Sequence, residues 1–154
     1  MTWLAFAFLT VFAWGVYGVM LHTGQMAIGD PELGRYKAFL WVGIAYFLTA
    51  VVAPLVLIAA KGGDLRFWSY PVKGLSWSFV AGIMGAIGAF GVLLAFGAKG
   101  SPPVVMAIVF AGAPIINAAV SLSLHPPKGG ISSVPFPFYL GIVLAAVGGC
   151  LVTF

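Results

Sequence analysis

The chain has 154 residues, of which 62% are hydrophobic and only 6% are charged. So few charged side chains leave too little polar surface to cover a soluble domain, and the composition predicts an integral membrane protein. The formal net charge is +4, but the seven basic residues are scattered over four loops and form no cluster. We therefore expect no nucleic-acid partner, and we interpret these residues as loop charges that set membrane topology.

Five apolar stretches are each long enough for a helix of about 20 residues to cross the hydrocarbon core of a bilayer. They are residues 3–21, 38–60, 75–98, 104–124 and 135–154. A transmembrane barrel would show alternating segments of roughly ten residues, whereas these stretches are apolar all round. We predict an all-α fold, in which residues 1–154 form a single integral membrane domain, a bundle of five transmembrane helices.

The first stretch lacks the basic region and short apolar core of a signal peptide, so we expect it to be retained. Lys61, Arg66, Lys73 and Lys128 lie on the side of the N-terminus, against Arg35, Lys37 and Lys99 on the other side. Four against three is a weak bias toward a cytoplasmic N-terminus and an external C-terminus, and it leaves insertion in both orientations open. The expected location is the cytoplasmic (inner) membrane of a bacterium.

The connections between the stretches are rich in turn-forming residues. Residues 22–37 form a predicted solvated loop, in which Asp30 and Glu32 have Arg35 and Lys37 as basic neighbours. Residues 61–74 mix charges with aromatic rings, which suits the headgroup layer. In the shortest link, residues 99–103, Gly100 is predicted to end one helix and Pro102 to begin the next.

Two sets of small residues recur every four positions, which places each set on one helical face. Such faces let helices approach closely in lipid, either within one chain or against a partner, and both interpretations stay open. The helix-packing candidates are Ala81, Gly85 and Ala89, and Gly141, Ala145 and Gly149.

No Asp, Glu, Lys or Arg lies well inside a predicted span, which argues against a proton antiporter that uses a membrane-embedded carboxylate. Asn117 is the most informative polar residue inside a span, either as a hydrogen-bonding link between helices or as a substrate ligand. Pro114 is expected to kink its helix and to free polar backbone near Asn117, and Pro54 to act likewise. Trp14 and Tyr17 share a face, for aromatic packing or for lining a cavity.

Catalytic and metal-binding patterns are missing from the sequence. There is no phosphate-binding loop, nucleophile elbow or carboxylate pair, so we do not expect an enzyme. His22 and His125 have no second ligand at a metal-binding spacing, and we expect neither a metal nor another cofactor. The one cysteine, Cys150, excludes an intramolecular disulfide.

Several of these features occur in one order along the chain: Trp14-Gly15, a Gly/Ala-rich third span ending Leu94-Ala95-Phe96-Gly97-Ala98, then Lys99-Gly100-Ser101-Pro102, Val104-Val105, Pro114 and the Gly-rich residues 137–149. In span number and order the whole chain resembles one EamA-type domain of the drug/metabolite transporter superfamily. Members commonly carry two such domains in inverted orientation around a central cavity. The resemblance therefore implies a homodimer or a heteromeric membrane partner, with a small-molecule substrate. The residues that it would place at the cavity are Trp14, Tyr17, Phe90, Phe110, Pro114 and Asn117.

The resemblance has one departure, because the family tends to carry a Glu just after the fourth span and this chain has His125-Pro126-Pro127 there. Two hypotheses follow. In the first, the chain is a half-size transporter that moves a small neutral or lipophilic metabolite as a dimer or with a partner. In the alternative, it is a non-transporting accessory or structural subunit of a larger membrane complex, in contact with lipid and other helices.

Overall fold

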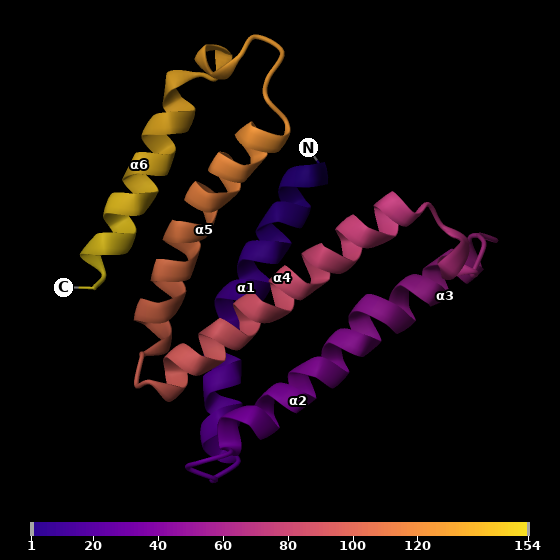
Figure 1. Cartoon of the computed structure of the whole chain (residues 1–154). Coiled ribbons are helices and arrows are strands. Elements are labelled where there is room, and N and C mark those ends of the chain that lie inside the picture. Colours follow the sequence, from indigo (N-terminus) through magenta and orange to yellow (C-terminus); the bar gives the residue numbers. More distant parts are fainter. Residues whose placement is uncertain (1, 154) are drawn as a thin grey trace. The chain divides into compact units, whose positions relative to one another are not determined.

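The computed structural model describes residues 2–153, which form helices joined by loops and contain no β-strand (Figure 1). The all-α prediction is confirmed. Met1 and Phe154, which the predicted domain includes, lie outside the described residues. The α-helices are α1 (Thr2–Ala27), α2 (Gly34–Phe47), α3 (Ala53–Ala60), α4 (Val72–Gly97), α5 (Pro102–Leu124) and α6 (Phe136–Leu151).

Among the described residues, four helical stretches are long and apolar enough to cross a membrane. They are Thr2–Ala27, Gly34–Ala60, Val72–Gly97 and Pro102–Leu124. The last apolar helix, α6, has 16 residues, or about 24 Å at 1.5 Å per residue, against a hydrocarbon core of about 30 Å. The short turns η2 (Phe67–Ser69) and η3 (Ile131–Ser133) lie in the loops that precede α4 and α6.

The first helix is longer than predicted. It continues past Leu21 to Ala27, so the loop assigned to residues 22–37 shrinks to residues 28–33. The polar side chains of this extra segment do not interrupt the helix, because a residue such as Thr23 bonds back to it: the Thr23 hydroxyl donates to the Val19 carbonyl at 2.8 Å. The helix ends where Gly29 adopts a positive φ of 68°.

The two internal prolines have different surroundings. Before Pro54 the chain forms one π-helical turn, η1 (Leu48–Val52), which joins α2 to α3. There the Ala53 N–H donates to the Leu48 carbonyl, five residues back. A π-helical turn is one of the few features that cause a sharp kink in a helix. Here it lies directly before Pro54, which has no backbone N–H to donate. Pro114, by contrast, lies inside an uninterrupted α5.

The link between α4 and α5 differs from the prediction in one residue. Pro102 begins α5 as expected. Lys99, however, and not Gly100, takes the left-handed conformation after α4, with φ 70°. A left-handed residue commonly ends a helix, and a non-glycine residue adopts this conformation at a cost of roughly 1–2 kcal/mol.

The chain divides after Ala98 into two compact units, the N-terminal unit (residues 2–98) and the C-terminal unit (residues 99–153). That the helices form one domain stays a prediction. In the N-terminal unit, α1, α2 and α4 contact one another. Its buried residues lie in the last part of α1, the first part of α2 and the last part of α4: Gly18, Leu21, Gly34, Ala38, Ala89, Val92, Leu93 and Phe96.

Small residues allow this contact. Gly34 is buried, and a Cβ added there would lie 3.3 Å from the Gln25 carbonyl oxygen. Nearby, the His22 and Phe96 rings meet edge to face with their centroids 5.4 Å apart. The opposite part of α1, residues 2–13, is exposed along its whole length. The helices of the N-terminal unit therefore pack together near the 28–33 loop, whereas α1 is uncovered at its N-terminal end.

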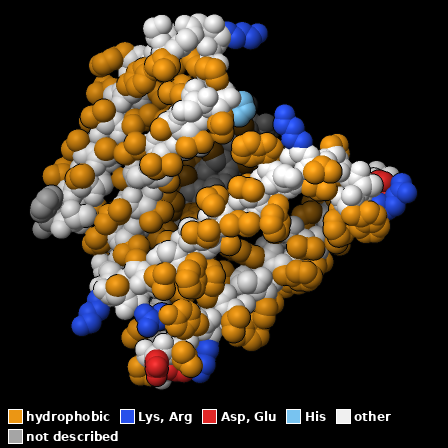
Figure 2. All heavy atoms as spheres, in the orientation of Figure 1, with side chains coloured by type: hydrophobic (Ala, Val, Ile, Leu, Met, Phe, Trp, Pro, Cys, Tyr) orange, Lys and Arg blue, Asp and Glu red, His pale blue; other side chains and the backbone are white. Residues whose placement is uncertain are grey.

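Hydrophobic side chains dominate the surface in Figure 2, and the charged ones gather at helix ends and loops. No charged or polar side chain is buried among residues 2–153. A surface of this kind suits hydrocarbon or other apolar helices.

The C-terminal unit is a helical hairpin of α5 and α6. Its closest approach is at Gly149, where an added Cβ would overlap the Ala111 side chain and lie 4.0 Å from the Ala107 carbonyl oxygen. Gly148, the neighbouring residue, has nothing within 4 Å of the same position. Gly149 is therefore the residue that lets these two helices touch.

We predict that Gly149→Ala destabilises the protein relative to Gly148→Ala. Both changes bring the same gain in helix propensity, of about 1 kcal/mol, but only the first overpacks the hairpin, at a cost of about 1–3 kcal/mol. Denaturation of the whole chain in mixed micelles, followed by circular dichroism, measures the difference. Equal stability of the two variants would refute the assigned contact.

Candidate functional site

An apolar groove with a volume of about 540 Å³ lies between α1 and α2. None of the residues that line it is charged. From α1 and the loop come Tyr17, Met20, Leu21, Gly24 and Ile28, and from α2 come Ala38, Trp41, Val42 and Ala45. We refer to it as the α1/α2 groove.

Tyr17 supplies the one side-chain hydroxyl in this groove. The hydroxyl oxygen is shielded from solvent and forms no hydrogen bond within 3.5 Å among the described residues, and the Tyr46 side chain of α2 is its polar neighbour within the chain. The ring lies against Trp14, with centroids 5.4 Å apart and planes inclined by 55°. A shielded hydroxyl without a partner loses free energy that a bound molecule with a polar group can restore.

The other predicted cavity residues lie elsewhere. Phe90 of α4 packs on Phe39, with ring centroids 5.4 Å apart, and near Tyr36, at 6.4 Å. It lines a separate apolar hollow of about 350 Å³ on the N-terminal unit. The structure therefore brings Trp14 and Tyr17 together, but it places Phe90 in a different aromatic cluster.

Phe110, Pro114 and Asn117 all belong to α5, at spacings of four and three residues, which places them on one side of that helix. All three are exposed, and Asn117 makes no side-chain hydrogen bond within residues 2–153. An amide in apolar surroundings requires such bonds, so this side of α5 is suited to face another polar group.

The two small-residue faces are packed only at their C-terminal ends. Ala89 is fully buried and Gly149 touches Ala111, whereas Gly85 and Gly141 have nothing within 4 Å of an added Cβ. Ala81 is also exposed, and Ala145 is half-buried. Each face therefore includes one intrachain contact and an uncovered remainder.

A second cavity, of about 350 Å³, lies where the 28–33 loop meets the ends of α1, α2 and α4. Asp30 organises this loop: its Oδ1 accepts hydrogen bonds from the N–H groups of Glu32 (3.1 Å) and Leu33 (2.9 Å), and its Oδ2 pairs with Lys37 Nζ at 2.6 Å. The Leu33 N–H, followed by Lys37, lowers the pKa of the Asp30 carboxyl from 3.8 to about 2.

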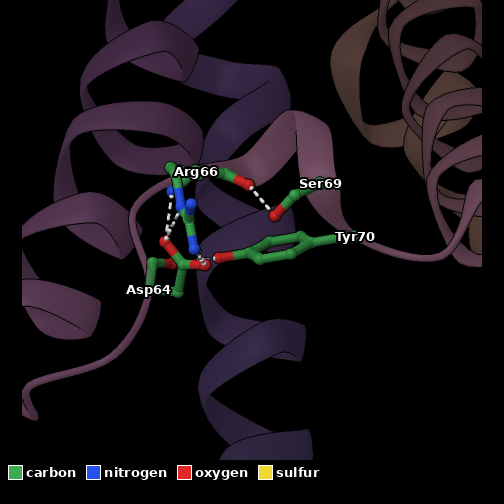
Figure 3. Close-up of polar contacts among 4 residues, drawn as sticks. All are labelled: Asp64, Arg66, Ser69 and Tyr70. Atoms are coloured by element: carbon green, nitrogen blue, oxygen red, sulfur yellow. Dashed lines mark hydrogen bonds and ion pairs between the residues drawn. The ribbon is translucent and has the colours of Figure 1, made fainter.

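The loop before α4 has a similar arrangement, shown in Figure 3. Arg66 pairs with Asp64 at 3.1 Å, and its hydrogen bonds hold the pKa of that carboxyl below its usual value. The Tyr70 hydroxyl donates to the Asp64 carbonyl at 2.6 Å, and the Ser69 hydroxyl to the Arg66 carbonyl at 2.7 Å. These bonds give residues 64–70 a defined shape in which Asp64 and Arg66 are paired.

Among the described residues, no three His, Cys, Asp or Glu side chains lie close enough together to hold a metal ion. Cys150 is exposed on α6.

The sequence analysis missed the α1/α2 groove, although a signal for it was present. Its lining residues recur at helical spacing on each helix, at positions 17, 20, 21, 24 and 28 and again at 38, 41, 42 and 45. Because both helices are apolar all round, this spacing did not distinguish the groove face from a lipid-facing one. The shorter loop, which sets the two helices against each other, was the missing information.

No protein-family model matches the chain, and comparisons with curated proteins and with solved structures also find no match.

The lowered pKa of Asp30 gives a pH prediction. Because its folded pKa lies below the ordinary value, the carboxylate stabilises the loop above about pH 4, and this contribution is lost as the pH falls toward 2. Carbon-detected NMR of the Asp30 carboxyl should show a midpoint near 2. Lys37→Gln should raise this midpoint, and Lys61→Gln, in another loop, should leave it unchanged. A wild-type midpoint near 4 would contradict the assigned bonds.

Proposed function

We propose that this chain is a half-size membrane transport subunit that moves a small neutral or lipophilic molecule as a dimer or with a membrane partner. The observation that supports this most is the α1/α2 groove, with its apolar walls and the shielded hydroxyl of Tyr17. Its volume of about 540 Å³ falls within the roughly 300–1,000 Å³ typical of small-molecule sites.

The chemistry of the groove favours uncharged ligands. It offers no ion-pair partner, so a charged molecule would lose its hydration without compensation. Trp41, 71% exposed, lies at the edge of the groove, where an indole ring can pack against a flat or aliphatic solute. The Tyr17 hydroxyl can form a hydrogen bond with one polar group of that solute and so orient it.

A partner chain is part of the proposal, because much of the helical surface has no intrachain cover. Residues 2–13 of α1 are exposed, and Asn117 of α5 lacks a hydrogen bond among the described residues. Two copies in opposite orientations would supply an inverted repeat, a common transporter design, and the four-to-three charge balance permits it. This is also the arrangement that the resemblance to an EamA-type domain implies, in a bacterial inner membrane.

The uncovered part of the face that includes Ala81 and Gly85 favours a second candidate, an accessory subunit of a larger membrane complex. Small residues with open space around them accept a partner helix at close range. In this function the α1/α2 groove would hold a lipid chain or a partner side chain rather than a transported solute.

Uptake by proteoliposomes that contain the whole chain separates the two. We predict uptake of at least one member of a panel of neutral amino acids and neutral lipophilic dyes. Trp41→Ala and Asn117→Leu should each reduce it about ten-fold or more, the change expected from loss of a main contact surface or of a polar ligand. Tyr17→Phe should reduce it only for solutes that carry a hydrogen-bonding group.

Trp68→Ala is the matched control, because Trp68 is 69% exposed in the turn η2 and lies outside both the groove and residues 2–13. Uptake no greater than in empty liposomes, or uptake indifferent to Trp41 and Asn117, would rule out the transport proposal and leave the accessory function.

A further inference from the structure

We propose that the cavity between Gln25 and Arg35 binds a phosphate group, as carried by a lipid headgroup or by a free phosphorylated solute. This cavity is separate from the α1/α2 groove and does not depend on transport. It lies beside the 28–33 loop, at the ends of helices long enough to span a membrane, and therefore at the depth where lipid phosphates lie.

Arg35 supplies the positive charge. The ion pairs found in the described part of the chain are Lys37–Asp30 and Arg66–Asp64, so Arg35 has no carboxylate of residues 2–153 within 4.0 Å. Its Nε is shielded from solvent and has no hydrogen-bond partner among residues 2–153. A guanidinium has five donors in a planar fork that matches phosphate oxygens, and a shielded donor left unpaired costs free energy.

The intrachain contacts of Arg35 position it without neutralising it. The guanidinium carbon lies 5.2 Å from the centre of the Tyr36 ring. The side chain also packs against Gly97 at the end of α4, where an added Cβ would overlap the guanidinium. The C-terminal end of a helix has only a partial negative charge, so the donors remain free for an anion.

The acidic groups nearest to this cavity do not compete for Arg35. Asp30 lines the cavity, but both of its oxygens are already engaged, by the N–H groups of Glu32 and Leu33 and by Lys37. Glu32, on the same loop, is exposed and forms no ion pair among the described residues. Of the charged side chains that line the cavity, Arg35 is therefore the one without an ion-pair partner among the described residues.

Gln25 adds a second, independent requirement. Its Oε1 is shielded and accepts no hydrogen bond among the described residues. The cavity thus presents donors from Arg35 and an acceptor from Gln25, within about 350 Å³, whereas a water molecule fills only about 30 Å³. A phosphate that carries a hydroxyl or ammonium group beside it satisfies both side chains.

The test measures binding to the purified whole chain with three probes: dioctanoyl phosphatidylglycerol, inorganic phosphate and dioctanoylglycerol, which has no phosphate. We expect phosphatidylglycerol to bind more tightly than dioctanoylglycerol. Arg35→Gln should weaken this binding about ten-fold or more, the change for one charge-assisted hydrogen bond. Arg66→Gln is the matched control and should leave it unchanged, because Arg66 is already paired with Asp64.

If inorganic phosphate competes with phosphatidylglycerol, the site also accepts a free phosphate. If it does not compete, the site requires the lipid. Either result supports the site. Equal binding of dioctanoylglycerol, or equal affinity of Arg35→Gln, overturns it. If Arg35→Gln does not fold, Gln25→Leu, which removes the acceptor, and Gly97→Ala, which displaces the guanidinium, replace it. Unchanged affinity in both of these variants also overturns the site.

Discussion

In a membrane, an apolar side chain gains little by leaving lipid for another apolar side chain, so helices associate where their backbones can come close. In this chain the close contacts coincide with small residues. Gly34 lets the start of α2 meet the end of α1, Gly97 makes room for Arg35, and Gly149 joins α6 to α5. The α1/α2 groove, the Arg35 cavity and the C-terminal hairpin all depend on these contacts.

The same constraint explains what the chain leaves uncovered. Away from these contacts the helices carry large exposed side chains such as Phe6 and Phe79, 66% and 72% exposed, which meet lipid or another chain. The two features proposed to bind ligands differ in chemistry. The α1/α2 groove lies between apolar helix faces and suits an uncharged molecule, whereas the Arg35 cavity lies beside a charged loop and suits an anion.

The helices could largely be predicted from the sequence, because length and hydropathy alone mark a span. The end of α1 could not, since His22, Thr23 and Gln25 resemble loop residues in composition while their backbone continues the helix. Arg35 was predicted to be one of two bases serving two acids. In the structure Lys37 is the base that pairs with Asp30, because the geometry of the loop brings these two side chains together. Trp14 and Tyr17 were predicted to share a helical face, and their rings pack together in the structure. The groove beside them could not be predicted, because it depends on which faces of α1 and α2 meet.

The central claim is that a second chain covers the exposed helix faces. Native mass spectrometry of the protein released directly from membrane vesicles tests it most directly, because no detergent purification step intervenes. The account predicts complexes of two copies, or of one copy with a distinct membrane partner. Release of the chain only as a monomer, with lipid as its sole companion, would contradict it.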